Sequence, residues 1–330
     1  MRRRQFIALI GGAAVTWPIA VEAQRPKVVM RQVGILTGAS GPVSDARVRM
    51  LVQGLGELGW LEGRNLRLEI RHGGGDGAAL RKHAEELVGL KPDVLVANGG
   101  TATQSLLQTT QAIPIVFSFV PDPVGSGFVN SLSRPGGNVT GFTQFEYTIG
   151  GKWLELLREI APSVKRVGVI RDPTGAAGVG QFAVIQAAAA AQSVETQPIN
   201  VRDPAELERE LNAFASVASG GLIVTSSTNA LVYRDLIINL AAKNKLPAVY
   251  AQREFVNAGG LVSYGADLFA VLRNAAGYVD RILKGEKPAN LPVQAPTKFE
   301  LVVNLKAAKR IGLTIPSSVL NRADRIIPDK

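Results

Sequence analysis

The chain has 330 residues, no cysteine and a formal net charge of +10 at pH 7. Its lysines and arginines are scattered among acidic residues, with no basic stripe interleaved with aromatic residues, so the composition argues against nucleic-acid binding. The absence of cysteine excludes a disulfide framework, and the 46% hydrophobic fraction permits ordinary apolar cores. A chain of this length fits two domains of usual size better than one.

Residues 1–23 have the pattern of an export signal. A basic start is followed by the uncharged stretch 6–21, which is short for a membrane span and rich in Gly, Ala and Pro. Small residues at Val21 and Ala23 predict cleavage after Ala23, which would remove three arginines and one glutamate and lower the formal charge from +10 to +8. Arg3-Arg4-Gln5-Phe6-Ile7 resembles a twin-arginine signal. A general secretory signal and a retained membrane anchor are the alternatives.

The first half of the chain predicts strands alternating with helices. Short apolar runs indicate the strands, and apolar residues at helical spacing indicate the helices between them. The expected strands cover residues 33–36, 66–70, 94–97 and 113–117. Ser44 is expected to cap the first helix, Gly59 to end it, and Asp76 to begin the second.

Residues 92–103 contain the first candidate ligand-binding turn. The buried strand 94–97 runs into Asn98, and Gly99-Gly100 breaks the pattern before Thr101, which is expected to cap the next helix. Open α/β sheets bind ligands at the carboxyl ends of their strands. Free amides at a helix start suit a carboxylate or phosphate, and glycines allow close approach to the backbone. A tight turn without a ligand is the alternative.

The second half of the chain repeats the alternation. Expected helices carry the apolar positions of residues 153–160, 182–189, 207–214, 236–240 and 268–282, and expected strands cover 167–170, 222–225, 247–250, 261–264 and 299–303. Asp203-Pro204 has the features of a helix start. The fold class is therefore α/β, with two doubly wound parallel-sheet lobes, and the cleft between them is the natural ligand site.

The sequence contains no convincing catalytic or nucleotide-binding motif. Gly54 to Gly59 matches G-x-G-x-x-G by letter, but it follows no strand and lies at the end of a helix. The chain has two histidines, His72 and His83, and no nucleophile with a recognisable base. We therefore expect no catalytic residue, no metal site and no cofactor.

Three further stretches carry a family resemblance. They are SLSRPGGNVTG at residues 131–141, REFVNAGGLVSYG at 253–265 and PTKFELVVNLK at 296–306. Together they resemble the ABC-transporter substrate-binding proteins often labelled as a tryptophan/tyrosine uptake type, and the resemblance runs from the expected signal to the C-terminus. It implies a periplasmic binding protein of type I, in which two lobes joined by a three-segment hinge trap a small ligand on closure.

The resemblance also implies a division of the chain. The N-terminal lobe is expected to contain residues 31–145 and 267–290, and the C-terminal lobe residues 146–266 and 291–330. The hinge is expected near 142–150 and 264–268. Delivery of the solute to an ABC permease and its ATPase in the inner membrane, a periplasmic location and a monomeric protein are the corresponding expectations.

Candidate ligand residues lie in the loops that follow the strands. The resemblance supports the turn at Gly99 and the loop at Asp122, and the relatives carry Thr-Asp-Asn where this chain has Ser227-Thr228-Asn229. The lost aspartate could have paired with an α-ammonium group, so the amino acid label does not follow from the resemblance alone. The full set of candidates is Ser40, Asn98, Gly99, Gly100, Thr101, Phe119, Asp122, Arg171, Ser227, Asn229 and Tyr250.

The ligand is expected to be a small solute with a carboxylate, an amino acid being one candidate. Its anionic group would lie at the start of the helix after Gly100. Arg171 could supply an opposing charge, and Phe119 or Tyr250 could stack on a planar ligand, although solvation and lobe packing are the alternatives. An exported α/β enzyme and the ligand-sensing domain of a signalling system are the alternative functions.

Overall fold

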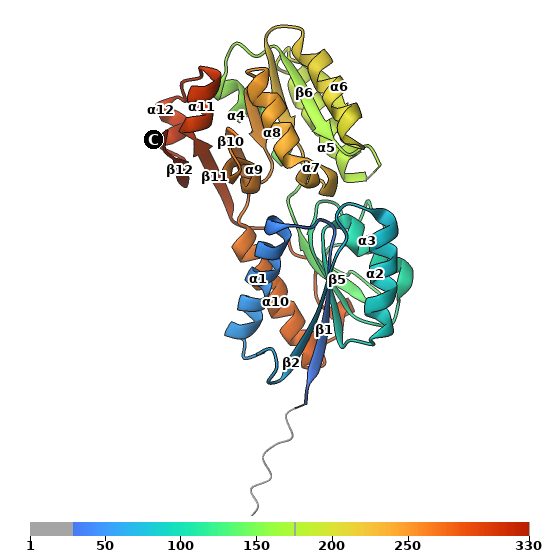
Figure 1. Ribbon diagram of the computed structural model, residues 1–330. Coiled ribbons are helices and arrows are strands. Elements are labelled where there is room, and N and C mark those ends of the chain that lie inside the picture. Colours follow the sequence, from blue (N-terminus) through green and yellow to red (C-terminus); the bar gives the residue numbers. More distant parts are fainter. Residues whose placement is uncertain (1–28, 175, 330) are drawn as a thin grey trace, which may run out of the picture.

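The computed structural model describes residues 29–174 and 176–329. The expected export signal, residues 1–23, lies outside the described residues. Within the part that is described, no helix has the length and apolarity needed to cross a membrane. The chain forms two α/β lobes, with the N-terminal lobe below and the C-terminal lobe above in Figure 1.

The N-terminal lobe contains a five-stranded parallel sheet in the order β2-β1-β3-β4-β5. Its strands are β1 (Arg31–Thr37), β2 (Leu66–His72), β3 (Val94–Asn98), β4 (Ile115–Val120) and β5 (Val139–Thr143). Its helices are α1 (Pro42–Glu57), α2 (Gly77–Gly89), α3 (Gly100–Thr109), the returning α10 (Leu268–Leu283) and the short 3-10 helix η1 (Pro288–Asn290). Figure 1 shows α10 beside α1, although the two helices are far apart in sequence.

The C-terminal lobe contains a seven-stranded sheet in the order β12-β11-β10-β9-β8-β6-β7, in which only the pair β10–β11 is antiparallel. Its strands are β6 (Arg166–Arg171), β7 (Glu195–Asn200), β8 (Gly220–Val224), β9 (Ala248–Tyr250), β10 (Val262–Ala266), β11 (Phe299–Asn304) and β12 (Arg325–Ile327). Its helices are α4 (Ile149–Ile160), α5 (Ala176–Ala190), α6 (Pro204–Ala215), α7 (Thr228–Val232), α8 (Arg234–Lys243), α9 (Arg253–Asn257), α11 (Leu305–Ile311) and α12 (Ser317–Leu320).

Each sheet has an apolar core on both faces, as the sequence predicts for doubly wound lobes. On β3, Val94 and Val96 pack with α1 and α10, whereas Leu95 and Ala97 pack with α2 and α3. This alternation follows from the period of two of a strand, and burial on both faces explains why the strand is a continuous apolar run. The carboxyl ends of the parallel strands β1 to β5 and β6 to β10 point toward the boundary between the lobes, whereas β11 and β12 run in the opposite direction.

The chain crosses between the lobes three times. The crossings lie between β5 and α4, at Asp267 between β10 and α10, and in the stretch before β11. Leu291 and Val293 pack in the cores of the N-terminal lobe, and Gln294 bonds to the backbone of β5, so residues 291–294 lie with that lobe and the third crossing is at 295–298. The domain division expected from the sequence had assigned residues 291–294 to the C-terminal lobe.

Two of the expected helix caps are wrong. Gly41 and Gly99 occupy the cap positions of α1 and α3, each with a positive φ that favours glycine, so that Ser44 and Thr101 lie inside the helices. Ser44 instead donates to the carbonyl of Ala39. Asp76 and Asp203 do cap α2 and α6 as predicted, because their carboxylates accept from the first amides of these helices.

Candidate functional site

A cavity of about 260 Å³ lies between the lobes at the carboxyl ends of their strands. Asn98, Gly99, Gly100 and Thr101 line it from the N-terminal lobe, together with Arg47 and Phe119. Asp172, Ser226, Ser227, Thr228 and Gln252 line it from the C-terminal lobe, and Gln144 lines it from the first crossing. Its volume suits one small solute enclosed by both lobes.

The start of α3 forms the N-terminal wall of the cavity. Gly99 has φ 98° and caps the helix, while its carbonyl accepts from the amide and the hydroxyl of Thr103 at 3.1 and 2.9 Å. The first amides of a helix have no carbonyl one turn earlier to bond, so those of Gly100 and Thr101 are available to a ligand. A Cβ built on Gly100 would meet no atom within 4 Å. This wall can therefore receive an anionic group directly on the backbone.

The C-terminal wall carries an acid that was not among the sequence candidates. Asp172 follows β6, and its Oδ2 accepts a hydrogen bond of 3.2 Å from Nδ2 of Asn229 on α7. Its Oδ1 accepts from the amide and the hydroxyl of Thr174 at 2.9 and 2.6 Å. Ser227 caps α7 by accepting from the amide of Ala230. A fixed carboxylate thus faces the same cavity as the amide-rich start of α3.

Direct contacts between the lobes close the cavity. Arg47 of α1 forms an ion pair with Glu254 of α9, and the hydroxyls of Thr101 and Thr228 lie 3.2 Å apart. The hydroxyl of Tyr147 in the first crossing donates to Oδ2 of Asp122 at 2.7 Å. Burial raises the pKa of Tyr147, and the bond to Asp122 adds to the effect. The lobes therefore have the closed arrangement of a two-lobed cleft.

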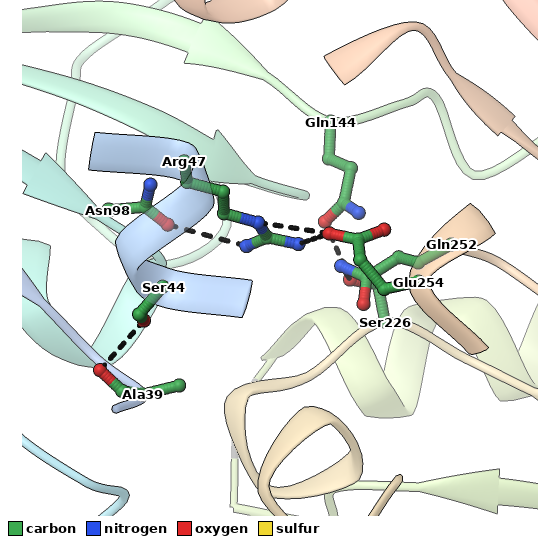
Figure 2. A network of polar contacts seen from close by, with 8 residues as sticks. All are labelled: Ala39, Ser44, Arg47, Asn98, Gln144, Ser226, Gln252 and Glu254. Carbon is green, nitrogen blue, oxygen red and sulfur yellow. Dashed lines mark hydrogen bonds and ion pairs between the residues drawn. The ribbon is translucent and has the colours of Figure 1, made fainter. Parts of the chain in front are cut away.

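Arg47 and Phe119 form one end of the cavity. The guanidinium of Arg47 lies 4.5 Å above the ring of Phe119 and donates to Oδ1 of Asn98 at 3.4 Å. Phe119 has φ 58°, an uncommon conformation for a residue with a side chain, at the point where the register of β4 against β5 shifts. Such strain persists where the surroundings hold it and often marks functional sites. Figure 2 shows Arg47 between Asn98 and Glu254.

The structure brings six of the eleven candidates from the sequence to the cavity lining. These are Asn98, Gly99, Gly100, Thr101, Phe119 and Ser227. Asn229 lies one contact behind the lining, where it bonds to Asp172, whereas Asp122 lies outside the lining and bonds to Tyr147 of the first crossing.

Three further candidates lie away from the lining. Ser40 is exposed in the loop before α1. Tyr250 is 1% exposed and stacks on Phe255 in the core, where burial raises its pKa. The guanidinium of Arg171 lies 4.9 Å above the ring of Phe182. Tyr250 points inward because of the alternation along β9, which the sequence run alone did not resolve.

Sequence reasoning missed several polar residues at or beside the cavity. They include Arg47, Gln144, Asp172, Ser226, Thr228, Gln252 and Glu254. Asp172 and Gln252 lie two residues beyond the ends of the expected strands 167–170 and 247–250, so their positions near strand ends were an available signal. Arg47 and Glu254 lie on helices, where a charged residue ordinarily indicates a solvent-facing position. Among residues 29–174 and 176–329, no group of three His, Cys, Asp or Glu side chains could hold a metal ion.

Comparisons with known proteins agree with this architecture. A family model described as ABC transporter substrate binding protein matches residues 32–327. The tyrosine-binding protein of Clostridioides difficile (strain R20291) is 24% identical over 289 residues, which cover 86% of this chain and 81% of the relative.

Two solved structures superpose on most of the chain. The structure of a conserved domain protein from Vibrio cholerae O1 biovar eltor has 32% identity and a TM-score of 0.85, and covers 90% of this chain and 99% of its own. The structure of the ABC domain in complex with L-Trp from Streptococcus pneumonia has 25% identity and a TM-score of 0.84. It covers 90% of this chain and 100% of its own.

Fold and cavity together define a two-lobed binding protein of the periplasmic type I architecture. The chain belongs to the family of ABC transporter substrate-binding proteins, because the family model spans nearly all of the described residues. The family binds small solutes and works with an ABC permease. Both the sequence-based recognition and the predicted fold class are thereby confirmed.

Proposed function

We propose that the interlobe cavity binds one free amino acid with an aromatic side chain. The observation that carries this proposal is the polarity of the cavity. The start of α3 offers amide donors on one wall, and Asp172 offers a carboxylate on the other. A zwitterion has complementary groups on adjacent atoms, so one small molecule can engage both walls and hold the lobes together.

The α-carboxylate binds at the start of α3. The amides of Gly100 and Thr101 and the hydroxyl of Thr101 can donate hydrogen bonds to it there, so no buried lysine is needed. A partly buried helix terminus favours an anion by up to about 2 kcal/mol. The contact between Thr101 and Thr228 lies beside this position, so closure of the cleft covers the carboxylate.

The α-ammonium group binds at Asp172. Relatives of the tryptophan/tyrosine uptake type carry an aspartate where this chain has the neutral Thr228, which had left an amino acid ligand in question. Asp172 comes from the neighbouring strand end and is held by Asn229 at 3.2 Å. It can therefore supply the missing negative charge from a different position in the sequence.

The side chain of the ligand packs toward Phe119. This ring is 4% exposed, lines the cavity and is covered on one face by the guanidinium of Arg47. Aromatic rings prefer offset or edge contacts with one another, and such pairs stabilise by about 0.5–1.5 kcal/mol beyond the burial of area. The names of two relatives, a tyrosine-binding protein and an L-Trp complex, support an aromatic ligand.

The remaining expectations follow from the family and the N-terminal sequence. The protein is exported by the signal of residues 1–23, is cleaved after Ala23, and works in the periplasm as a monomer. It delivers its ligand to an ABC permease driven by an ATPase and catalyses no reaction. N-terminal sequencing of the exported protein would give Gln24 as the first residue, whereas an intact Met1 in a membrane fraction would contradict the proposed processing.

Native mass spectrometry of the protein as purified, followed by calorimetry, tests the ligand class. We expect a co-purifying mass equal to that of an amino acid, and tighter binding of L-tryptophan and L-tyrosine than of L-leucine. If none of the three binds, or if L-leucine binds best, the aromatic amino acid assignment is wrong.

A further inference from the structure

The end of the N-terminal lobe opposite the cleft carries a group of exposed apolar side chains. The described residues include eleven large apolar side chains that are exposed, and five of them lie in the segments that precede β1, β2 and β3. They are Val29, Met30, Leu58, Leu61 and Leu90, with exposures between 41% and 65%. This end of the lobe is at the bottom of Figure 1, where β1 begins. Exposed apolar residues that gather in one place indicate a contact surface.

Hydrogen bonds place these segments side by side. The amide of Arg31 donates to the carbonyl of Asn65 at 3.0 Å, and the guanidinium of Arg31 forms an ion pair of 2.7 Å with Asp93. The start of β1 therefore lies between the loop that precedes β2 and the loop that precedes β3. Lys287 borders the same edge, because it lines a groove together with Arg31 and Asp93. This surface, called the amino-end face below, contains residues 29–31, 58–65, 90–93 and 287.

Three exposed cations accompany the apolar residues. They are Arg64, Lys91 and Lys287. Their side chains make no hydrogen bond or ion pair with any of the described residues 29–174 and 176–329. The segment 24–28, which precedes Val29 in the sequence, adds one arginine and one lysine. The amino-end face thus combines apolar side chains with unpaired positive charge.

Acidic residues do not balance this charge. Asp93 on the face and Glu286 beside it are already in ion pairs of 2.7 and 2.6 Å, which leaves the exposed Glu62. The charge therefore selects the kind of partner. A second copy of the chain, docked through the same face by twofold symmetry, would bring cations against cations. A bilayer with anionic headgroups attracts the cations and takes apolar side chains into its interfacial region.

We infer that the amino-end face binds the surface of a bilayer that contains anionic phospholipid. Leu61 and Leu90 enter the interfacial region, while Arg64, Lys91 and Lys287 contact the headgroup phosphates. Attachment by this face leaves the cleft accessible to solute, because the cavity lies at the carboxyl ends of the strands, at the other end of the lobe. The inference does not depend on which ligand the cavity binds.

Vesicle sedimentation tests the inference. Residues 24–330 contain every described residue and lack the apolar stretch 6–21, which would itself bind lipid, so this chain is used. It should bind vesicles of phosphatidylglycerol and phosphatidylcholine in about equal amounts roughly tenfold tighter than vesicles of phosphatidylcholine alone. Salt at about 0.5 M should weaken the binding, because it screens the attraction between the cations and the headgroups.

Trp60 can report the contact directly. It is partly exposed on the amino-end face, next to Leu61. Trp153, the other tryptophan of residues 24–330, is 0% exposed and lies in the core of the C-terminal lobe. Anionic vesicles with brominated acyl chains should therefore quench part of the tryptophan emission, and Trp60→Phe should lose this quenching.

Two double variants locate the contact on the face. Arg64→Glu with Lys287→Glu reverses two of its cations, and Leu61→Ser with Leu90→Ser removes two of its leucines. Each should weaken binding to the anionic vesicles roughly tenfold or more. The circular dichroism spectrum and thermal midpoint of each variant establish that it is folded.

A matched control changes the net charge by the same amount elsewhere. Arg209→Glu with Lys306→Glu reverses two exposed cations of the C-terminal lobe, whose side chains likewise make no hydrogen bond or ion pair with the described residues. These positions are far from the amino-end face, so binding to the anionic vesicles should stay within about threefold of the wild type.

Several results would overturn the inference. Equal binding to both kinds of vesicle would do so, and so would an equal loss in the control and in Arg64→Glu with Lys287→Glu, because net charge alone would then attract the protein. Unchanged binding after loss of the two leucines, or Trp60 emission that brominated lipid does not quench, would mean that the face does not contact lipid. A dimer that the leucine variant dissociates, without binding to vesicles, would make the face a self-association surface.

Discussion

Arg47 of α1 and Glu254 of α9 form a buried ion pair that joins the two lobes. Their side chains are 7% and 9% exposed, and Nε of Arg47 lies 3.0 Å from Oε1 of Glu254. Arg47 also lines the ligand cavity and contacts Asn98 and Phe119. The two residues belong to different lobes, so an open cleft would separate them and return both charges to water. The pair therefore links the filling of the cavity to the closure of the lobes.

Breaking this pair should weaken ligand binding. Glu254→Gln leaves Arg47 buried in the closed protein without a charged partner, and the loss of one member of a buried pair costs about 3–5 kcal/mol. Because the open protein does not bear this cost, the affinity for L-tryptophan should fall by roughly a hundredfold to a few thousandfold. Calorimetry of the variant measures the fall.

The double variant shows whether the effect arises from an unpaired charge. Arg47→Met combined with Glu254→Leu removes both charges, and it should bind more tightly than either single variant. As a matched control, Arg281→Met breaks the exposed pair of Arg281 with Glu286 within one lobe and should leave the affinity unchanged. Additive losses in the double variant would mean that the two residues act independently.

Ligand binding should make the protein more compact. The interlobe contacts, Arg47 with Glu254 and Thr101 with Thr228, exist only when the lobes are closed, and a ligand that touches both walls favours that population. Small-angle scattering should give a smaller radius of gyration with saturating L-tryptophan than without it. An unchanged radius at saturation would argue against hinge closure.

The two glycines at the start of α3 should respond differently to substitution. Gly100 has open space where a Cβ would lie, so Gly100→Val should fold with a free energy within about 1 kcal/mol of the wild type. Its side chain would stand where the ligand's carboxylate binds, and the affinity should fall at least tenfold. Gly99 has φ 98°, so Gly99→Ala should destabilise the fold by about 1–2 kcal/mol.

Urea unfolding and calorimetry measure the two effects separately. If Gly100→Val retains wild-type affinity for L-tryptophan, the start of α3 is a structural turn and receives no ligand group.

The strands and the first wall of the cavity could be predicted because their signals are local. An apolar run followed by Asn98-Gly99-Gly100 indicates a strand, a turn and a helix start within a few residues. The ion pair that joins the lobes depends on a long-range contact that no local sequence pattern predicts. Arg47 and Glu254 are 207 positions apart and come together only through the packing of α1 against the C-terminal lobe.

Some strands were missed for a different reason. β7 is an edge strand that pairs only with β6, and it contains Pro198 and several polar residues. Such a sequence lacks the continuous apolar run of a buried strand. β12 is short and mostly exposed, so its pattern is equally weak.

Asp267 should make the stability of the protein depend on pH in the acid range. It caps α10 at the second crossing, and its Oδ2 lies 3.1 Å from Nζ of Lys298 in the third. Burial opposes its ionisation, but the hydrogen bonds from Lys298 and from the amides of Ala270 and Phe269 outweigh it and lower the pKa of Asp267.

A carboxyl whose pKa is lower in the folded protein stabilises the fold above its unfolded pKa, near 3.9, and loses this contribution as the pH falls through the folded value. Asp267→Asn retains a residue that can cap a helix but removes the charge. Urea unfolding between about pH 6 and pH 2 should show a shallower loss of stability in Asp267→Asn than in the wild type. Parallel curves would mean that the carboxylate contributes nothing through its charge.

Calorimetric titration with L-tryptophan and with L-tryptophanamide tests the central claim, that the start of α3 receives the carboxylate of a free amino acid. The amide keeps the aromatic ring and the α-ammonium group but lacks the negative charge. Since a helix terminus favours an anion by up to about 2 kcal/mol, the acid should bind roughly tenfold to thirtyfold tighter than the amide. Equal affinities for L-tryptophan and L-tryptophanamide would contradict the claim.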